Sequence, residues 1–221
     1  VSQPSEAKLV RLDLQLPKKK IGYIMGAGDL VQQNLIAIGL PISSIDIESI
    51  SPVELNKFDT ILVGIRAFNV LEALKYKNKL LFDFAAQGGN LIVQYNTSRG
   101  LKTKEIAPYP IELSRKRVTD ENSRVRILEP SHPAMNSPHK ITAADFDGWI
   151  QERGLYFADN WDPRFTPLLG MNDSGEEETV GSLLVAKHGN GSIVYTGLSF
   201  FRELPEGVPG AYRLLINLLA L

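Results

Sequence analysis

The sequence contains no cysteine. This absence excludes disulfide bonds, zinc sites with thiolate ligands and a cysteine nucleophile, whatever fold the chain adopts. Histidine is also scarce, with three residues in 221. His132 and His139 lie seven residues apart in a segment interrupted by prolines, and this spacing does not bring several ligands to one ion. We therefore expect no metal site.

The chain also lacks a strong charge of either sign and a long apolar run. Its formal net charge is -1, so we expect no strong attraction to nucleic acid or to an anionic membrane. The basic clusters at 18–20 and 115–117 are short and typical of solvated surface. No apolar run approaches the roughly 20 residues of a membrane span, and the N-terminus has no signal-peptide pattern. Because the sequence starts with Val1 rather than Met, we expect a piece of a longer or processed protein.

Short apolar runs, several of them ending in glycine, alternate with segments of helical spacing over residues 20–95. Such an alternation predicts an α/β fold, with a mainly parallel sheet that carries helices on both faces. The expected strands are 21–25, 42–47, 59–65 and 90–95, and the expected helices are 30–38, a short one from Pro52, and 70–86.

This regularity ends after Asn96. Residues 97–123 predict a long insertion over an edge of the sheet, and 124–128 has the composition of another strand. A β-hairpin is expected at 182–196, around Gly189-Asn190-Gly191, followed by a C-terminal helix at 211–221. We expect residues 1–19 to be a lead-in segment or linker and residues 20–221 to form one domain.

Five segments carry a family resemblance. They are IGYIMGAGD (21–29), FDTILVGIRAFN (58–69), GGNLIVQYNTS (88–98), DFDGWIQERGLYF (145–157) and the run from 189 to 219. Together they resemble the class I glutamine amidotransferase-like module, of flavodoxin-like fold, found at the C-terminus of bacterial PIG-L/LmbE-type deacetylase proteins. The resemblance implies a deacetylase domain upstream in the parent chain, a carbohydrate-related role and export to the periplasm or the cell surface.

Two departures from that family limit the chemistry. Active class I amidotransferases carry a cysteine at the turn after the strand that ends here at Tyr95, whereas this chain has Tyr95-Asn96-Thr97-Ser98. The zinc motif of PIG-L deacetylases is also missing, because His132-Pro133 is followed by Ala-Met-Asn without a carboxylate. We therefore assign no catalytic residue and expect neither amidotransferase nor deacetylase activity from this chain alone.

The turn Gly26-Ala27-Gly28-Asp29 invites comparison with a dinucleotide-binding loop. Val31 occupies the place of the third glycine, where it would crowd the contact between helix and strand that the motif needs. A tight turn in which Asp29 caps the next helix explains the same residues. We therefore expect no nucleotide cofactor.

The candidate site follows from the strand order. Asp29, Arg66 and Asn96 end three strands, and the carboxyl ends of parallel strands meet at one edge of a sheet. Arg66 could bind an anionic or polar ligand, or pair with an acid such as Asp29. We expect the segment 145–157 to close over this edge, although its aromatic residues could instead cover the sheet while Glu152 and Arg153 pair. The candidate ligand-binding residues are Asp29, Arg66, Asn69, Tyr95, Asn96, Trp149, Glu152, Arg153 and Arg202.

Two functions remain open at this point. The leading hypothesis is a non-catalytic amidotransferase-like accessory domain that binds a glycan, a small polar ligand or a partner domain. The alternative is a hydrolase of a carbohydrate or amide substrate without a cysteine nucleophile, which would use Ser98, or Asp29 and Glu152 with His132.

Overall fold

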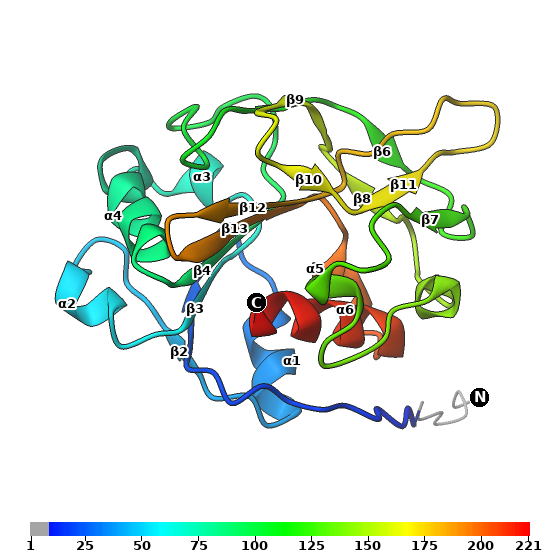
Figure 1. Ribbon diagram of the computed structural model, residues 1–221, viewed down its shortest axis with the longest axis horizontal. Coiled ribbons are helices and arrows are strands. Elements are labelled where there is room, and N and C mark those ends of the chain that lie inside the picture. Colours follow the sequence, from blue (N-terminus) through cyan, green and yellow to red (C-terminus); the bar gives the residue numbers. More distant parts are fainter. Residues whose placement is uncertain (1–8) are drawn as a thin grey trace, which may run out of the picture.

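The centre of the fold is a seven-stranded sheet (Figure 1). The computed structural model describes residues 9–221, so part of the expected lead-in segment lies outside the described residues. The strand order is β10-β12-β13-β4-β3-β1-β2, in which β12 and β10 run antiparallel to their neighbours and the other pairings are parallel. The prediction of a mainly parallel α/β sheet is confirmed. The strands are β1 (Ile21–Ile24), β2 (Ile42–Ser44), β3 (Thr60–Val63), β4 (Asn90–Gln94), β10 (Thr166–Pro167), β12 (Leu183–His188) and β13 (Gly191–Thr196).

Helices cover both faces of this sheet because successive side chains of each strand point to opposite sides. Leu62 packs in the cluster that includes α1 (Val31–Ala37) and α6 (Pro209–Ala220), whereas Ile61 and Val63 pack in the cluster that includes α4 (Leu74–Ala86). The strands are therefore buried on both sides, which explains their nearly continuous apolar runs. The short helices are α2 (Pro52–Leu55), α3 (Ala67–Val70) and α5 (Phe200–Glu203).

Small antiparallel ladders replace the irregular insertion that the sequence predicts after Asn96. They gather at one side of the central sheet, at the upper right of Figure 1. Their strands have two to four residues, too short for an alternation of apolar and polar residues to be recognised. The ladders pair β5 (Ile111–Leu113) with β9 (Ala158–Trp161), β6 (Arg117–Val118) with β8 (Gly154–Leu155), and β7 (Val125–Ile127) with β11 (Leu169–Met171); two 3₁₀ turns, η1 (Pro133–Met135) and η2 (Ala143–Phe146), follow β7.

The observed boundaries differ from the predicted ones in a few places. The long helix expected at 70–86 is divided, because Leu71 adopts an extended conformation between α3 and α4. The second strand ends at Ser44. Residues 9–20 form no regular element, yet Leu12 and Leu14 pack against the core and the Gln15 backbone N–H donates to His139 Nε2 at 3.2 Å. None of the helices in residues 9–221 has the length and apolar character needed to cross a membrane.

Gly210 provides a test of the packing between α6 and η2. A Cβ atom at this position would lie 1.8 Å from the Asp145 carbonyl oxygen. Helix propensity alone predicts that Gly210→Ala stabilises the protein by about 1 kcal/mol. Because overpacking costs roughly 1–3 kcal/mol or more, we expect Gly210→Ala to lower the free energy of unfolding measured in urea. A variant as stable as the wild type would contradict this packing.

Candidate functional site

The carboxyl ends of β1, β3 and β4 lie side by side because these strands are parallel neighbours. Backbone hydrogen bonds connect the turns that follow them. The Ala27 N–H donates to the Ile65 carbonyl oxygen at 2.8 Å, and the Arg66 N–H donates to the Tyr95 carbonyl oxygen at 2.8 Å. The chain segments that carry Asp29, Arg66 and Asn96 therefore meet at one edge of the sheet, as their positions in the sequence predict.

Asp29 makes its contacts within the fold. The Tyr23 hydroxyl donates to its carboxylate at 2.7 Å, and the Val31 backbone N–H donates to Oδ1 at 2.9 Å. Burial, together with the Asp29 carboxylate, raises the pKa of the Tyr23 phenol. Within the part of the chain that the structure describes, no ion pair joins Asp29 to Arg66. The structure thus shows Asp29 as an anchor for the start of α1.

Two amide side chains fix the turns after β3 and β4. Asn96 is fully buried, and its Oδ1 accepts from the Phe68 backbone N–H at 2.9 Å while its Nδ2 donates to the Gln94 carbonyl oxygen. Asn69 donates to the carbonyl oxygens of Thr97 and Arg99 and accepts from the Thr97 N–H. These contacts leave Asn96 no access to solvent and hold the backbone around Arg66.

Arg66 itself has an unusual backbone conformation, with φ 55° and ψ 19°. The left-handed region costs a non-glycine residue about 1–2 kcal/mol. Gln151 at φ 63° and Tyr156 at φ 55° share it, and no other non-glycine residue among 9–221 has a positive φ. Backbone strain of this kind gathers at functional sites, where the ligand-binding geometry requires it.

The strained residues surround an aromatic stack at the end of β4. The rings of Tyr95 and Tyr156 are stacked, with centroids 6.1 Å apart and planes 8° apart, and the Phe201 ring lies 5.3 Å from that of Tyr95. The Tyr195 hydroxyl donates to the Tyr156 carbonyl oxygen at 2.6 Å and so fixes the strained turn. We call the following set the strand-end cluster: Arg66, Tyr95, Gln151, Glu152, Tyr156, Phe201 and Arg202.

The charges of the strand-end cluster are unevenly compensated. Arg202 Nε donates to Glu152 Oε1 at 3.0 Å, and Arg202 Nη1 also contacts the Gln151 amide oxygen. Arg66 is exposed, and its guanidinium makes no hydrogen bond or ion pair with another described residue. Burial raises the pKa of the Tyr95 phenol, while the positive charges of Arg66 and Arg202 oppose this rise. One uncompensated cation therefore stands beside the aromatic stack.

Trp149 and Arg153 lie behind this cluster. Trp149 is 3% exposed and its Nε1–H donates to the Asp145 carbonyl oxygen at 2.9 Å. Arg153 is 4% exposed and donates to the carbonyl oxygens of Ser123 and Phe146. Both side chains stabilise the segment 145–157, and the expected alternative of a Glu152–Arg153 pair is replaced by the pair of Glu152 with Arg202.

Nothing in the sequence identified Gln151 as a site residue, because a left-handed backbone at a non-glycine residue leaves no compositional signal. Tyr156 and Phe201 were visible only as aromatic residues in segments with other uses. Their convergence on Tyr95 depends on how the segment 145–157 and α5 pack together.

The residues of the hydrolase alternative form no catalytic pair. His132 Nδ1 accepts from the Ala134 backbone N–H at 3.1 Å, and burial lowers the pKa of this imidazole. Glu152 is paired with Arg202. No hydrogen bond in residues 9–221 connects Ser98 with a base, and these residues also contain no group of three or more His, Asp or Glu side chains placed to hold a metal ion.

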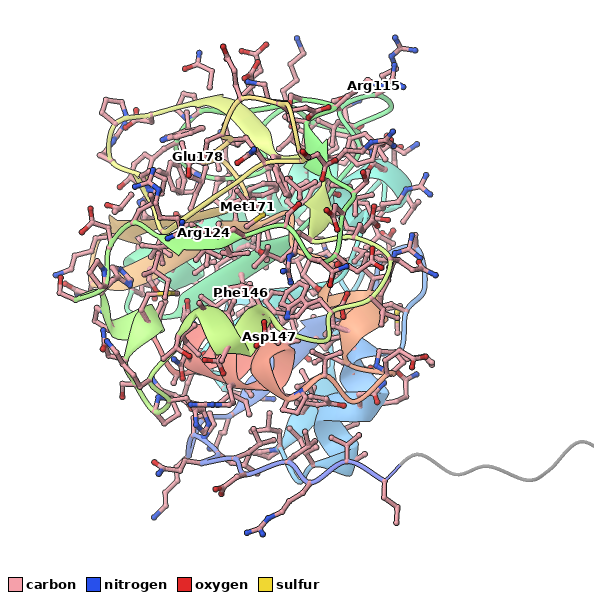
Figure 2. All side chains as sticks on the ribbon, turned by 90° about the vertical axis from the view of Figure 1, so that its right-hand side faces the viewer. Arg115, Arg124, Phe146, Asp147, Met171 and Glu178 are labelled. Atoms are coloured by element: carbon pink, nitrogen blue, oxygen red, sulfur yellow. The ribbon has the colours of Figure 1, made fainter. Side chains whose placement is uncertain are left out.

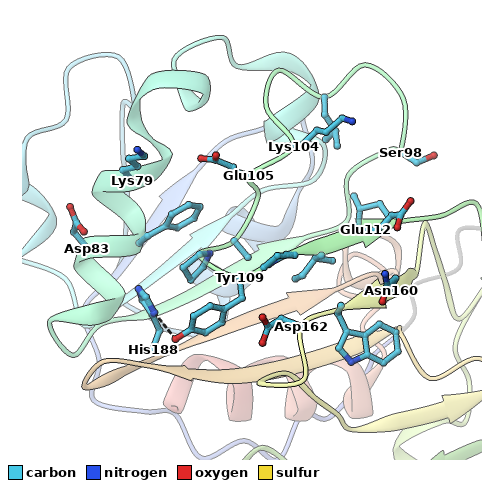
Figure 3. Close-up of a pocket in the computed structure, with 18 of the residues that line it drawn as sticks. Lys79, Asp83, Ser98, Lys104, Glu105, Tyr109, Glu112, Asn160, Asp162 and His188 are labelled. Atoms are coloured by element: carbon cyan, nitrogen blue, oxygen red, sulfur yellow. Dashed lines mark hydrogen bonds between the residues drawn. The ribbon is translucent and has the colours of Figure 1, made fainter.

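A large groove lies apart from the strand-end cluster. Its volume is about 1190 Å³, and its walls are α4, the segment 98–113 and the β5–β9 ladder (Figure 3). None of the ligand-binding residues proposed from the sequence lines it. Sequence patterns could not indicate this groove, because it forms between elements of the insertion and a helix that precedes it.

Known proteins provide a fold but no close relative. No family model and no curated protein matches the chain. Similar solved structures include a GMP synthase protein from Thermoplasma acidophilum, with 11% identity over 94% of this chain and 96% of the other at TM-score 0.54. A ThuA-like protein from Bacteroides uniformis has 12% identity over 98% and 93% at TM-score 0.54. A β-galactosidase from a Rahnella species has 13% identity over 90% of this chain but 31% of its own, at TM-score 0.53.

These similarities concern the fold alone, since all three identities are very low. They support a class I glutamine amidotransferase-like, flavodoxin-like α/β fold, shared with the GMP synthase protein and the ThuA-like protein. The similarity to the β-galactosidase shows that this fold also occurs as one part of a longer chain.

Glu203 gives the site a testable pH dependence. Its carboxylate is fully buried, accepts from the Ile150 backbone N–H at 3.0 Å and from the Ser199 hydroxyl at 3.2 Å, and so connects α5 to the segment that carries Glu152. Burial raises the pKa of Glu203 to about 7. The unfolded chain loses this proton near pH ~4.3, so the folded state binds it more tightly between about pH 4.5 and about pH 7.

The free energy of unfolding should therefore decrease as the pH rises through this window, by about 2 kcal/mol. Glu203→Gln should remove much of this slope in urea titrations at successive pH values. Glu54→Gln is the control, because hydrogen bonds from Ser51 lower the pKa of that exposed carboxylate and its titration falls below the window. An unchanged slope in Glu203→Gln would show that the carboxylate keeps an ordinary pKa.

Proposed function

We propose that this chain is a non-catalytic, amidotransferase-like accessory domain that binds a glycan at the strand-end cluster. The observation that carries the proposal is the gathering of Arg66, Gln151 and Tyr156, all with strained backbones, around the stacked ring of Tyr95.

The strain is hard to explain by folding alone. Glycine adopts the left-handed region without steric cost, so a fold that only needed the turn would favour glycine at these positions. The Arg66 side chain is exposed and bonds to nothing else that the structure describes, so its retention gives the fold no contact. A ligand that binds the guanidinium would explain why a long cationic side chain occupies the turn.

The chemistry of the cluster suits a sugar that carries a carboxylate. The flat, partly exposed rings of Tyr156 and Phe201 can pack against the C–H face of a pyranose ring. The planar guanidinium of Arg66 can bind a carboxylate through two hydrogen bonds. Glu152 and Gln151 offer oxygen acceptors for hydroxyl groups beside them. We therefore propose an acidic monosaccharide unit, such as a uronic acid, as the ligand of this site.

The absence of a nucleophile supports a binding role over a catalytic one. Tyr95 stands where the cysteine of active amidotransferases would stand, and its phenol is held neutral by burial, which raises its pKa. A neutral hydroxyl needs a neighbouring base to attack a substrate, and no base contacts Tyr95 or Ser98 in the described structure. We propose that the module lost the thiolate chemistry and kept a binding edge.

The wider context is part of the same proposal. The segments that resemble PIG-L/LmbE-associated modules favour a parent protein in which a deacetylase domain acts on a carbohydrate and this domain binds the same glycan or docks against that domain. The domain of similar fold within a β-galactosidase is a precedent for such a module in a longer carbohydrate-active chain.

Arg66→Ala tests the site directly. Calorimetric titration with glucuronate, galacturonate and their disaccharides should detect binding to the wild type and a roughly tenfold or greater loss of affinity in the variant. Binding should weaken as salt is added, since the Arg66 contact is exposed. Arg124→Ala is the matched control, because Arg124 is an exposed arginine on the insertion beside β7 and belongs to no cluster contact (Figure 2).

Equal affinity of Arg66→Ala and the wild type would exclude the strand-end cluster as the binding site. A wild type that binds none of these acidic sugars at millimolar concentration would remove the glycan from the proposal. Loss of binding in Arg124→Ala as well would indicate a non-specific electrostatic effect and would also count against the site.

A further inference from the structure

The groove between α4 and the β5–β9 ladder has the properties of a second binding site. Figure 3 shows Lys79 and Asp83 on α4 at one side, Glu112 and Asn160 at the other, and Tyr109 between them. No residue of the strand-end cluster lines this groove. Its volume of about 1190 Å³ exceeds the roughly 300–1,000 Å³ of pockets for small molecules, so it fits an extended ligand.

Tyr109 is an aromatic surface with a fixed orientation. Its hydroxyl donates to the Lys187 carbonyl oxygen at 3.2 Å and bonds to His188 Nδ1 at 2.9 Å, the contact drawn as a dashed line in Figure 3. The Arg164 guanidinium lies 3.6 Å from the ring centroid, and the Phe165 ring meets it edge-on at 6.0 Å. A ring held at its face, edge and hydroxyl loses little entropy when a ligand packs against it.

Trp161 supplies a second aromatic surface. It is half-buried in β9 opposite Ile111 and lines the groove. Its indole N–H has no hydrogen-bond partner among the described residues and is not buried. An indole with an available N–H and an apolar ring can both stack on a ligand and donate to it.

Several polar groups along the groove also lack partners inside the protein. The Lys79 ammonium, the carboxylates of Asp83 and Glu112, and the Asn160 amide make no side-chain hydrogen bond or ion pair with any residue of 9–221. Glu112 and Asn160 are direct cross-strand partners in the β5–β9 ladder. The groove thus offers donors and acceptors together, which is what hydroxyl groups require because each both donates and accepts.

The charge of the groove is nearly balanced. Lys79 and Lys104 face Asp83, Glu105 and Glu112 across it, and the remaining acid, Asp162, is neutralised by two hydrogen bonds from Arg164 at 2.7 Å each. This pairing lowers the pKa of Asp162 to about 2, so the pair persists at neutral pH. A strongly charged ligand would find no net attraction here.

We propose that this groove binds a neutral oligosaccharide chain, whose sugar rings stack on Tyr109 and Trp161 and whose hydroxyl groups bond to Asp83, Glu112 and Asn160. The site differs in place and in ligand charge from the strand-end cluster, and the proposal does not depend on that site. An extended peptide is the competing occupant, but the available groups are side chains of both hydrogen-bonding kinds rather than a row of backbone groups that would pair with a peptide strand.

Tryptophan fluorescence can report on the groove because the chain has two tryptophans, and Trp149 is buried away from it. Titration of the protein with cellohexaose, xylohexaose, maltohexaose and chitohexaose should change the emission saturably for at least one of them. The matching monosaccharide should bind at least tenfold more weakly, and the affinity should be the same at low and high salt.

Variants separate this site from others. Trp161→Phe should abolish the fluorescence response, and Asn160→Ala, which alters an exposed side chain, should weaken binding several-fold by calorimetry. Tyr76→Ala is the aromatic control, since Tyr76 is 71% exposed on the same helix and outside the groove. Arg66→Ala should bind the oligosaccharide like the wild type, even if the strand-end proposal fails.

The proposal would be overturned if no hexasaccharide of the panel changed the emission or bound by calorimetry. It would also be overturned if Asn160→Ala and Trp161→Phe bound as tightly as the wild type, or if a library of extended peptides bound the groove while the sugars did not.

Discussion

The hydrogen bond from the Arg66 backbone N–H to the Tyr95 carbonyl oxygen is the contact on which the strand-end geometry depends. It joins the turn after β3 to the turn after β4 and obliges Arg66 to take a left-handed conformation immediately before α3. Asn96 reinforces it by bonding the Phe68 N–H from a fully buried position. The Tyr95 ring then projects from a fixed backbone, and Tyr156 and Phe201 pack on it.

A second layer of contacts supports this arrangement. Glu203 accepts from the Ile150 N–H and places the segment 145–157 against α5, so that Gln151 and Glu152 reach Arg202. Arg153 and Trp149 fill the interior behind that segment. The residues expected to bind a ligand thus fall into two groups: some hold the turns, and others present side chains at the edge.

The sequence predicted the central fold well because each strand carries its own evidence. Runs such as 59–65 and 90–95 are apolar throughout and end near glycine or a polar turn, and the structure confirms a strand within each. The insertion was not predictable in this way, since strands as short as β6 and β8 pair only through contacts far apart in the sequence. For the site, the meeting of three turns followed from parallel topology. The roles of Asp29 and Asn96 did not, because the same side chain can cap a helix, fix a turn or bind a ligand, and packing decides between these uses.

The central claim is that the strain at Arg66 serves a ligand and not the fold, and the unfolding free energies of Arg66→Gly and Arg66→Ala in urea test it most directly. Glycine removes a left-handed strain of about 1–2 kcal/mol but adds entropy to the unfolded chain, which offsets part of the gain. The account predicts that Arg66→Gly is at least as stable as the wild type, by up to about 1 kcal/mol, and that Arg66→Ala matches the wild type within about 0.5 kcal/mol. A loss of more than about 1 kcal/mol in both variants would show that the arginine side chain stabilises the fold, and would contradict the claim.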